Sequence, residues 1–255
     1  MYALVMDKGI GNTAFVQDND LHGKQGVTLF QPEEYFDLRG EPLAYLFQQC
    51  VYVWDVLKIL PEQTALLTAE PHIEGKVHET AVLEGPVRVE AGAVIGPHVH
   101  IVGPSVICAG AHIRHGAFIR EHCIIGPGSI VGHDTEVKGS LMLSGSAAPH
   151  FAYVGDSVLG HRVNLGAGTK LANFKLQGDQ IVILHEGEMY PTGLRKMGAI
   201  VGDRASIGCN AVTAPGTLIG KDAWIYSLIS LRGVIPAHSI VKPANGFRIE
   251  TKRES

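Results

Sequence analysis

The sequence has few aromatic residues and no long apolar segment. Phe, Trp and Tyr together make up 7% of its 255 residues. No apolar run approaches the roughly 18 residues that a transmembrane helix needs, and the segment MYALVMDKG carries charges where a secretory signal peptide would be apolar. The sequence therefore predicts a cytoplasmic protein, in a reducing compartment, with no membrane partner.

Cysteines are few and the net charge is small. The four cysteines form no CxxC pair and no spacing typical of metal ligands, which favours free thiols and predicts no metal site. The formal net charge is −4, so the chain as a whole has no electrostatic attraction to nucleic acid or to an anionic membrane surface. We expect neither as a partner.

The abundant features are 31 glycines and a repeat of six residues. Steps of six from Val77 reach Val, Leu or Ile at every position, and a mostly small residue lies four positions after each. The aliphatic positions are Val77, Leu83, Val89, Ile95, Ile101, Ile107, Ile113, Ile119, Ile125, Val131, Val137 and Leu143. A fixed short period sustained over this length indicates a repeat architecture.

A period of six matches neither an α-helix nor an alternating strand. It fits one side of a triangular coil, in which a short strand points its aliphatic residue inward and a turn at the small residue starts the next side. Three sides make a coil of about 18 residues, and coils stack about 4.8 Å apart. The predicted fold class is mainly β, a left-handed parallel β-helix of hexapeptide repeats. The left hand is taken from the resemblance to that repeat class, because it departs from the usual right-handed crossover.

The segment before the repeat predicts a small N-terminal α/β cap. Short strands are expected at 3–6 and 27–30, and one helix over about 42–60, which begins near Pro42 and ends at Pro61. We expect the apolar stripe of this helix to cover the open edge of the first coil. The predicted divisions are 1–70 for the cap, 71–243 for the β-helix and 244–255 for a loosely held tail.

Two breaks interrupt the hexads, at 144–153 and at 173–198, and both predict inserted loops. Within the second, 181–184 and 189–190 flank a polar turn and predict a hairpin arm. A smooth solenoid has no pocket, so function usually collects at such interruptions.

Residues suited to chemistry surround the first break. Arg120 and Lys138 are 18 residues apart and each follows an inward aliphatic residue, so they should stack on one face with no acid between them in that row. Like charges at β spacing are unfavourable unless an anion joins them. With Glu136, His150 and Tyr153 nearby, the pattern favours a phosphorylated substrate that must also lose a proton.

The segment PHFAYVGDSVLGHRVNLGAGTKLANF resembles the acetyltransferase domain of the bifunctional glucosamine-1-phosphate acetyltransferase/N-acetylglucosamine-1-phosphate uridylyltransferase family. The family pattern is His, Tyr three residues on, GD, VNxGAGT and Asn, met here by His150, Tyr153, Gly155–Asp156, Val163–Thr169 and Asn173. The match extends back to Lys138, Glu136 and Arg120, and forward through GLRKMGAIVGD, as in the archaeal-type branch. No uridylyltransferase domain is recognisable, so we expect no synthesis of a nucleotide sugar from UTP.

The resemblance implies an acetyl-CoA-dependent N-acetyltransferase of an aminosugar 1-phosphate, either glucosamine-1-phosphate or galactosamine-1-phosphate. Direct transfer needs a base for the amine, and histidine suits that role. The implied catalytic residues are His150, Asn173 and Cys209, with backbone amides near Cys209 placed to stabilise the oxyanion. The implied substrate-binding residues are Arg120, Glu136, Lys138, Tyr153 and Asn164. The implied coenzyme-binding residues are Asn173, Phe174, Cys209 and Ser227.

Resembling enzymes are homotrimers with each active site between neighbouring subunits, and the 173–198 arm is expected to reach across. The chain departs from the family at Phe174, where many relatives have Tyr, at Cys209, where Ser is frequent, and at Ser227, where Ala is usual. A lysine that often follows the Asn has three candidates here, Lys175, Arg195 and Lys196.

Two further classes remain alternatives. One is a non-catalytic sugar-phosphate-binding or scaffold β-helix, and the other is an acyltransferase for another aminosugar. A metal enzyme of the γ-carbonic anhydrase type is disfavoured, since that class needs three histidines, two of them five residues apart, and no two histidines here have that spacing. His115 and His133, 18 residues apart, should stack without a third ligand.

Overall fold

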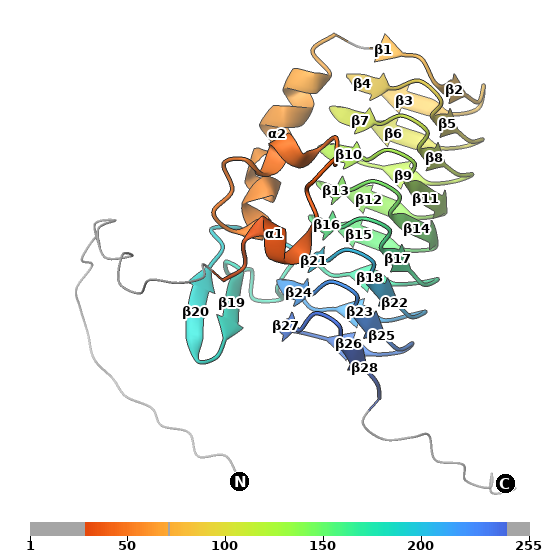
Figure 1. The fold of residues 1–255 in the computed structure, drawn as a ribbon. Coiled ribbons are helices and arrows are strands. Elements are labelled where there is room, and N and C mark those ends of the chain that lie inside the picture. The colour runs from red at the N-terminus through yellow and green to blue at the C-terminus, as the bar shows by residue number, and fades with distance from the viewer. Residues whose placement is uncertain (1–28, 71, 244–255) are drawn as a thin grey trace, which may run out of the picture.

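The computed structural model describes residues 29–70 and 72–243 (Figure 1). The strand predicted at 3–6 and the tail predicted over 244–255 lie outside these residues, as does the first half of the strand predicted at 27–30. Its second half, Leu29 and Phe30, forms a turn. No helix in the described ranges is long and apolar enough to cross a membrane.

Three parallel sheets form the sides of a β-helix (Figure 1). Sheet A comprises β1 (His72–Ile73), β4 (Val87–Val89), β7 (Ser105–Ile107), β10 (Cys123–Ile125), β13 (Leu141–Met142), β16 (Val158–Leu159), β21 (Ala199–Val201), β24 (Thr217–Ile219) and β27 (Val234–Ile235). Sheet B comprises β2 (Lys76–Val77), β5 (Val94–Ile95), β8 (His112–Ile113), β11 (Ile130–His133), β14 (Ala147–His150), β17 (Asn164–Leu165), β22 (Ser206–Ile207), β25 (Trp224–Ile225) and β28 (Ile240–Val241). Sheet C comprises β3 (Val82–Glu84), β6 (His100–Val102), β9 (Phe118–Ile119), β12 (Glu136–Lys138), β15 (Tyr153–Gly155), β18 (Lys170–Leu171), β23 (Val212–Thr213) and β26 (Ser230–Leu231).

The register confirms the predicted left-handed parallel β-helix. Cys123 pairs with Ser105 and Ile101 with Ile119, each 18 residues apart. The repeated aliphatic residues from Val89 to Val137 point inward and are at most 1% exposed. Since successive coils repeat the same inward position, one continuous apolar core runs along the axis.

The first break in the hexads is not an inserted loop. Ile125 pairs with Met142 and Met142 with Leu159, each 17 residues apart, so one residue is missing in each of two successive turns from sheet C to sheet A. Met142 therefore takes the inward position predicted for Leu143, and Leu143 packs on the outer side of sheet A instead. The prediction of a loop at 144–153 is wrong, because the turn absorbs the deletion while β14 and β15 continue the ladders.

The second break is an insertion between β18 and β21, where the sequence predicts a hairpin. Its strands β19 (Val182–His185) and β20 (Glu188–Pro191) pair antiparallel. The hairpin packs on the cap of its own chain: Ile183 is 2% exposed, and the rings of Tyr190 and Phe30 lie 5.0 Å apart. Figure 1 shows the hairpin and the cap on the same side of the β-helix.

The cap differs from the single predicted helix. It contains α1 (Pro32–Tyr35), the 3₁₀ turns η1 (Ala44–Phe47) and η2 (Val53–Asp55), and α2 (Val56–Leu67). The prediction of a helix over 42–60 is wrong, because Pro61 lies inside α2. Its missing N–H is tolerated since buried residues on both sides, Leu57, Leu60 and Thr64, keep α2 packed.

The cap covers the flank of sheet A and not the end of the β-helix. Trp54 and Leu60 are at most 1% exposed and pack in one cluster with Ile124 and Leu141 of sheet A. Ile73, in the first strand of sheet A, remains 49% exposed. The expectation that the stripe closes the first coil is therefore wrong, although the stripe itself is buried.

The cysteines are free thiols, as expected. Cys123 is completely buried in the coil core, and burial raises the pKa of its thiol to about 12. Cys209 is exposed.

A buried carboxylate fastens the cap to the coils. Asp203 is 0% exposed, and its two oxygens accept hydrogen bonds from the backbone N–H groups of Asp37 at 2.7 Å and His161 at 2.8 Å. Both acceptors are needed, because an unpaired N–H in a buried site is unfavourable.

Asp203→Asn should lower the free energy of unfolding by about 1–3 kcal/mol, since one carboxylate oxygen becomes an NH₂ group that faces an N–H donor. Urea unfolding followed by circular dichroism would measure the change. The matched control is Asp134→Asn, at an exposed corner, where the change should stay within about 0.5 kcal/mol. Equal stability of the two variants would show that Asp203 does not fasten the cap.

Candidate active site

A pocket of about 290 Å³ opens at the corner between sheets C and A. We call the turns that lead from a strand of sheet C to the next strand of sheet A the C–A corner. Arg120 directly follows β9, Lys138 ends β12 and Asn173 lies beyond β18, so successive coils bring them to the same corner. The residues that line the pocket are Arg120, Lys138, Tyr153, Asn173, Phe174 and Lys196.

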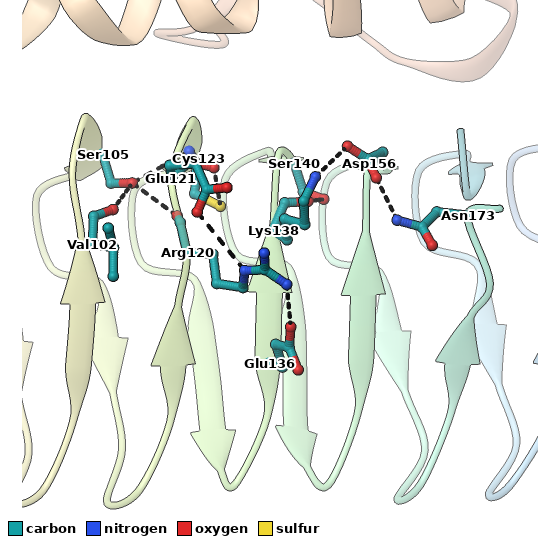
Figure 2. A network of polar contacts seen from close by, with 10 residues as sticks. All are labelled: Val102, Ser105, Arg120, Glu121, Cys123, Glu136, Lys138, Ser140, Asp156 and Asn173. Carbon is teal, nitrogen blue, oxygen red and sulfur yellow. Dashed lines mark hydrogen bonds and ion pairs between the residues drawn. The ribbon is translucent and has the colours of Figure 1, made fainter. Parts of the chain in front are cut away.

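Each of the two stacked cations has a carboxylate partner (Figure 2). Arg120 Nη1 donates to Glu136 Oε1 at 3.1 Å, and its Nε lies 3.7 Å from Glu121 Oε2. Lys138 Nζ donates to Asp156 Oδ1 at 3.0 Å. The row that contains Arg120 and Lys138 has no acid of its own, as expected. The acidic partners Glu121 and Asp156 each lie one position further along the chain, in the turn that follows the row.

Gly155 leaves room for the polar groups of the pocket. A Cβ atom at this position would lie 2.6 Å from the Tyr153 hydroxyl and 2.7 Å from Asn173 Nδ2, so any other residue would displace both. Burial raises the pKa of Tyr153, and the nearby carboxylates of Glu136 and Asp156 add to the effect. The phenol is therefore held as a hydrogen-bond donor.

The base of the arm adds a third cation. Lys196 lines the pocket, and its Nζ lies 5.9 Å from the centre of the Phe174 ring, the same distance as Arg195 Cζ. Lys175, the other candidate for a family lysine, donates to the carbonyl of Gln180 at 2.9 Å and does not line the pocket. The structure thus distinguishes Lys196 among the three candidates, which the sequence alone did not.

The remaining predicted residues lie elsewhere. We call the turns from sheet B to sheet C the B–C corner. His150, Cys209 and Ser227 lie there on the exposed surface. One coil, with Ala167 and Gly168 at this corner, separates His150 from Cys209, and Ser227 lies in the coil after Cys209. His150 is five residues before Gly155, so the two are at most about 17 Å apart. Asn164 is exposed on the strand β17 of sheet B.

Within one chain, therefore, the predicted base and the predicted phosphate-binding residues occupy opposite edges of sheet C. Arg120, Lys138 and Asn173 share the C–A corner, whereas His150 and Cys209 share the B–C corner. Glu136 and Tyr153 lie between them on sheet C, as a registered pair. Sequence reasoning did not anticipate this division.

Sequence reasoning gave no role to Glu121 and Asp156 of the C–A corner, and it named Lys196 only as one of three candidates for a family lysine. Glu121 and Asp156 hold the cations, and Lys196 lines the pocket. Asp156 did carry a signal, because it belongs to the GD pair of the family pattern. Glu121 follows Arg120 directly and had no signal beyond that.

The histidines of the B–C corner stack as expected. The rings of His115 and His133 are 5.0 Å apart, with 3.1 Å between their Nδ1 atoms. Among the residues that the structure describes, no group of three or more His, Cys, Asp or Glu side chains is placed to hold a metal ion.

Comparison with known proteins finds relatives of this chain. Residues 101–190 match the family model described as GMPPB C-terminal domain. The bifunctional protein GlmU of Methanococcus aeolicus is 32% identical over 201 residues, which are 79% of this chain and 48% of that protein. A bifunctional sugar-1-phosphate nucleotidylyltransferase/acetyltransferase of Sulfurisphaera tokodaii is 36% identical over 152 residues, 60% of this chain and 38% of that protein.

Among solved structures, the acetyltransferase domain of PglB from Neisseria gonorrhoeae, in complex with acetyl coenzyme A, is 12% identical, with a TM-score of 0.26. The likeness covers 64% of this chain and 53% of that one. The chain spans about half the length of the curated relatives it matches. Over that length it is a relative of the archaeal bifunctional GlmU and sugar-1-phosphate nucleotidylyltransferase/acetyltransferase proteins, as its sequence motifs predict.

Proposed function

We propose that the chain is an N-acetyltransferase that moves an acetyl group from acetyl-CoA to the amine of an aminosugar 1-phosphate. The observation that carries the proposal is the pocket at the C–A corner, where Arg120, Lys138 and Lys196 gather around Tyr153. Cations that carry N–H donors are the groups that bind phosphate best. Glucosamine-1-phosphate and galactosamine-1-phosphate are the candidate substrates.

The proposed reaction is direct transfer. The ammonium of the bound sugar loses a proton to His150, and the free amine attacks the thioester carbonyl of acetyl-CoA. Backbone N–H groups near Cys209 stabilise the tetrahedral oxyanion. Collapse of this intermediate breaks the C–S bond, and the leaving sulfur takes the second proton of the attacking nitrogen, so the products are the neutral amide and free CoA. Glu136 and Asn164 orient the sugar, while Asn173, Phe174 and Ser227 hold the coenzyme.

The proposed assembly is a homotrimer. In a three-fold ring each interface joins one face of a subunit to a different face of its neighbour. The separation of His150 and Lys138 on opposite edges of sheet C supports this, because a site between subunits takes one edge from each. The arm packs on its own cap, so the opposed edges, and not the arm alone, are the proposed contact.

The test is release of free CoA from acetyl-CoA in the presence of each aminosugar 1-phosphate. The amine without its phosphate and the phosphate without its amine serve as controls. We expect turnover only when both groups are present, and its loss in Arg120→Ala. Tight binding of the sugar phosphate with no CoA release would instead establish a non-catalytic binding protein. Turnover of another aminosugar alone would move the activity to a different substrate.

A further inference from the structure

One carboxylate at the C–A corner joins two of the proposed site residues. The side chain of Asp156 is 16% exposed, and its two oxygens accept from different partners (Figure 2). Oδ1 accepts from Lys138 Nζ at 3.0 Å, and Oδ2 accepts from Asn173 Nδ2. Lys138 belongs to the preceding coil and Asn173 follows the next one, so Asp156 connects three coils at the pocket wall.

We propose that Asp156 is a positioning residue of this site, which holds the ammonium of Lys138 and turns the carbonyl oxygen of Asn173 towards the pocket. An ionised carboxylate can only accept hydrogen bonds, so the Asn173 atom that faces it must be the NH₂ group. The amide is planar, and its oxygen therefore points away from Asp156. The pocket gains a fixed acceptor beside its cations.

The backbone is built to keep the carboxylate in place. Asp156 has a φ of +44°, a left-handed conformation that is unfavourable for a residue with a Cβ atom. Its N–H donates to the carbonyl of Lys138 at 2.8 Å, and its own carbonyl accepts from Gly198 at the end of the arm, also at 2.8 Å. A Cβ at Gly139 would lie 2.7 Å from Asp156 Oδ1, so that glycine leaves space for the carboxylate.

The chain offers a matched control at another corner. Asp222 has a φ of +57°, and its carboxylate is bound by both Nε and Nη2 of Arg204, at 2.8 and 2.7 Å. It thus has the same conformation and an ion pair of its own, but it lies in the turns from sheet A to sheet B, away from the pocket. Removal of either carboxylate has similar local consequences, and only Asp156 has Asn173 as a partner.

The role rests on the proposed function, since an acceptor at Asn173 matters to chemistry only if an N–H donor binds there. The sugar amine and the amides of the coenzyme arm both carry such donors. Both oxygens of a carboxylate accept hydrogen bonds, whereas an amide can flip and exchange its oxygen for its NH₂ group. Asp156 therefore keeps Asn173 in one orientation whichever substrate is bound.

The first test needs no activity. In protein labelled with ¹⁵N-asparagine, the side-chain NH₂ signals of Asn173 are assigned by their loss in Asn173→Ala. We expect these signals to shift and to exchange faster with solvent in Asp156→Asn, and to stay unchanged in Asp222→Asn. If they do not respond to Asp156→Asn, the proposal is overturned, whatever the enzyme does.

The second test is kinetic, with Asp222→Asn again as the control. Asp156→Asn should lower kcat/KM by about 10- to 100-fold, the effect of a lost charge-assisted hydrogen bond, whereas Asp222→Asn should change it less than about twofold. In an Asn173→Ala background the same Asp156 substitution should cost several-fold less, since part of its effect passes through Asn173. Fully additive losses would overturn the proposal.

A further variant keeps the proposal testable if Asp156→Asn fails to fold. Asp156→Gly removes the carboxylate and relieves the positive φ, so it should fold at least as well as the wild type. It should show the same signal changes at Asn173 and the same kinetic loss. If the wild type itself released no CoA, the proposed function would fail, and the amide signals would still decide whether Asp156 orients Asn173.

Discussion

His150→Ala should lower kcat by roughly 10²–10⁴-fold, the usual contribution of a general base. KM for the sugar phosphate should change little, because the cations of the pocket lie on the other edge of sheet C. The wild-type rate should fall on the acid side, since only a neutral imidazole accepts a proton, and His150→Ala should lack this dependence. Steady-state kinetics with saturating acetyl-CoA across pH would measure both effects.

His115→Ala is the matched control for this prediction. His115 is also exposed, and it occupies the same corner row two coils earlier. Its loss should leave kcat within about twofold of the wild-type value, as for a substitution remote from the chemistry. Near wild-type turnover in His150→Ala would refute its role as the base, and with it the main reason to place chemistry at the B–C corner.

Lys138→Ala should have the opposite kinetic signature. Loss of one charge-assisted phosphate contact is worth about 1.5–3 kcal/mol, and KM for the phosphorylated sugar should rise about 10- to 100-fold. The variant also leaves Asp156 without its cation, which adds repulsion towards the phosphate. A rise in KM for acetyl-CoA alone would place the phosphate elsewhere.

Mixed trimers of the two impaired variants should regain activity when they are assayed at low sugar phosphate. His150→Ala keeps an intact C–A corner, and Lys138→Ala keeps an intact B–C corner. If each site takes one corner from each of two neighbours, equal co-expression makes about a quarter of the sites fully wild type. At sugar phosphate well below KM we expect about a quarter of the wild-type rate, at least about twofold above Lys138→Ala alone and more than tenfold above His150→Ala alone.

The control mixture pairs Lys138→Ala with Arg120→Ala. Both substitutions lie at the C–A corner, so no combination of subunits restores an intact one. Activity should remain at the level of the separate variants. Absence of recovery in the first mixture, or sedimentation of the protein as a monomer at micromolar concentration, would contradict a site shared between subunits.

The coil and many of the site residues could be predicted, because both follow from the spacing of residues along the sequence. A separation of 18 residues placed Arg120 and Lys138 at one corner, and the pocket contains both. The family motif added Tyr153 and Asn173, which also line the pocket. Partners such as Glu121 and Asp156 could not be derived from the inward positions, since they depend on how each turn bends after its strand.

The predicted limits of the helix and the predicted loop at the first break were wrong for a related reason. Pro61 stops an isolated helix, but packing of Leu57 and Leu60 on sheet A holds α2 together through it. A change of one residue in the hexads looks like a loop in the sequence. In the structure the same change is absorbed by a turn, because the parallel ladders on both sides preserve their pairing.

The sequence by itself determined the β-helix, since a six-residue period is a local property that each coil repeats against the next. Only the tertiary structure decided where the cap and the arm pack, and which corner each site residue occupies. Several C–A turns that are one or two residues short, and the insertion after β18, move every later side chain relative to a strict period. Which groups meet is therefore set by the stacking of whole coils and the burial of the cap on sheet A, and neither is encoded in residue spacing alone.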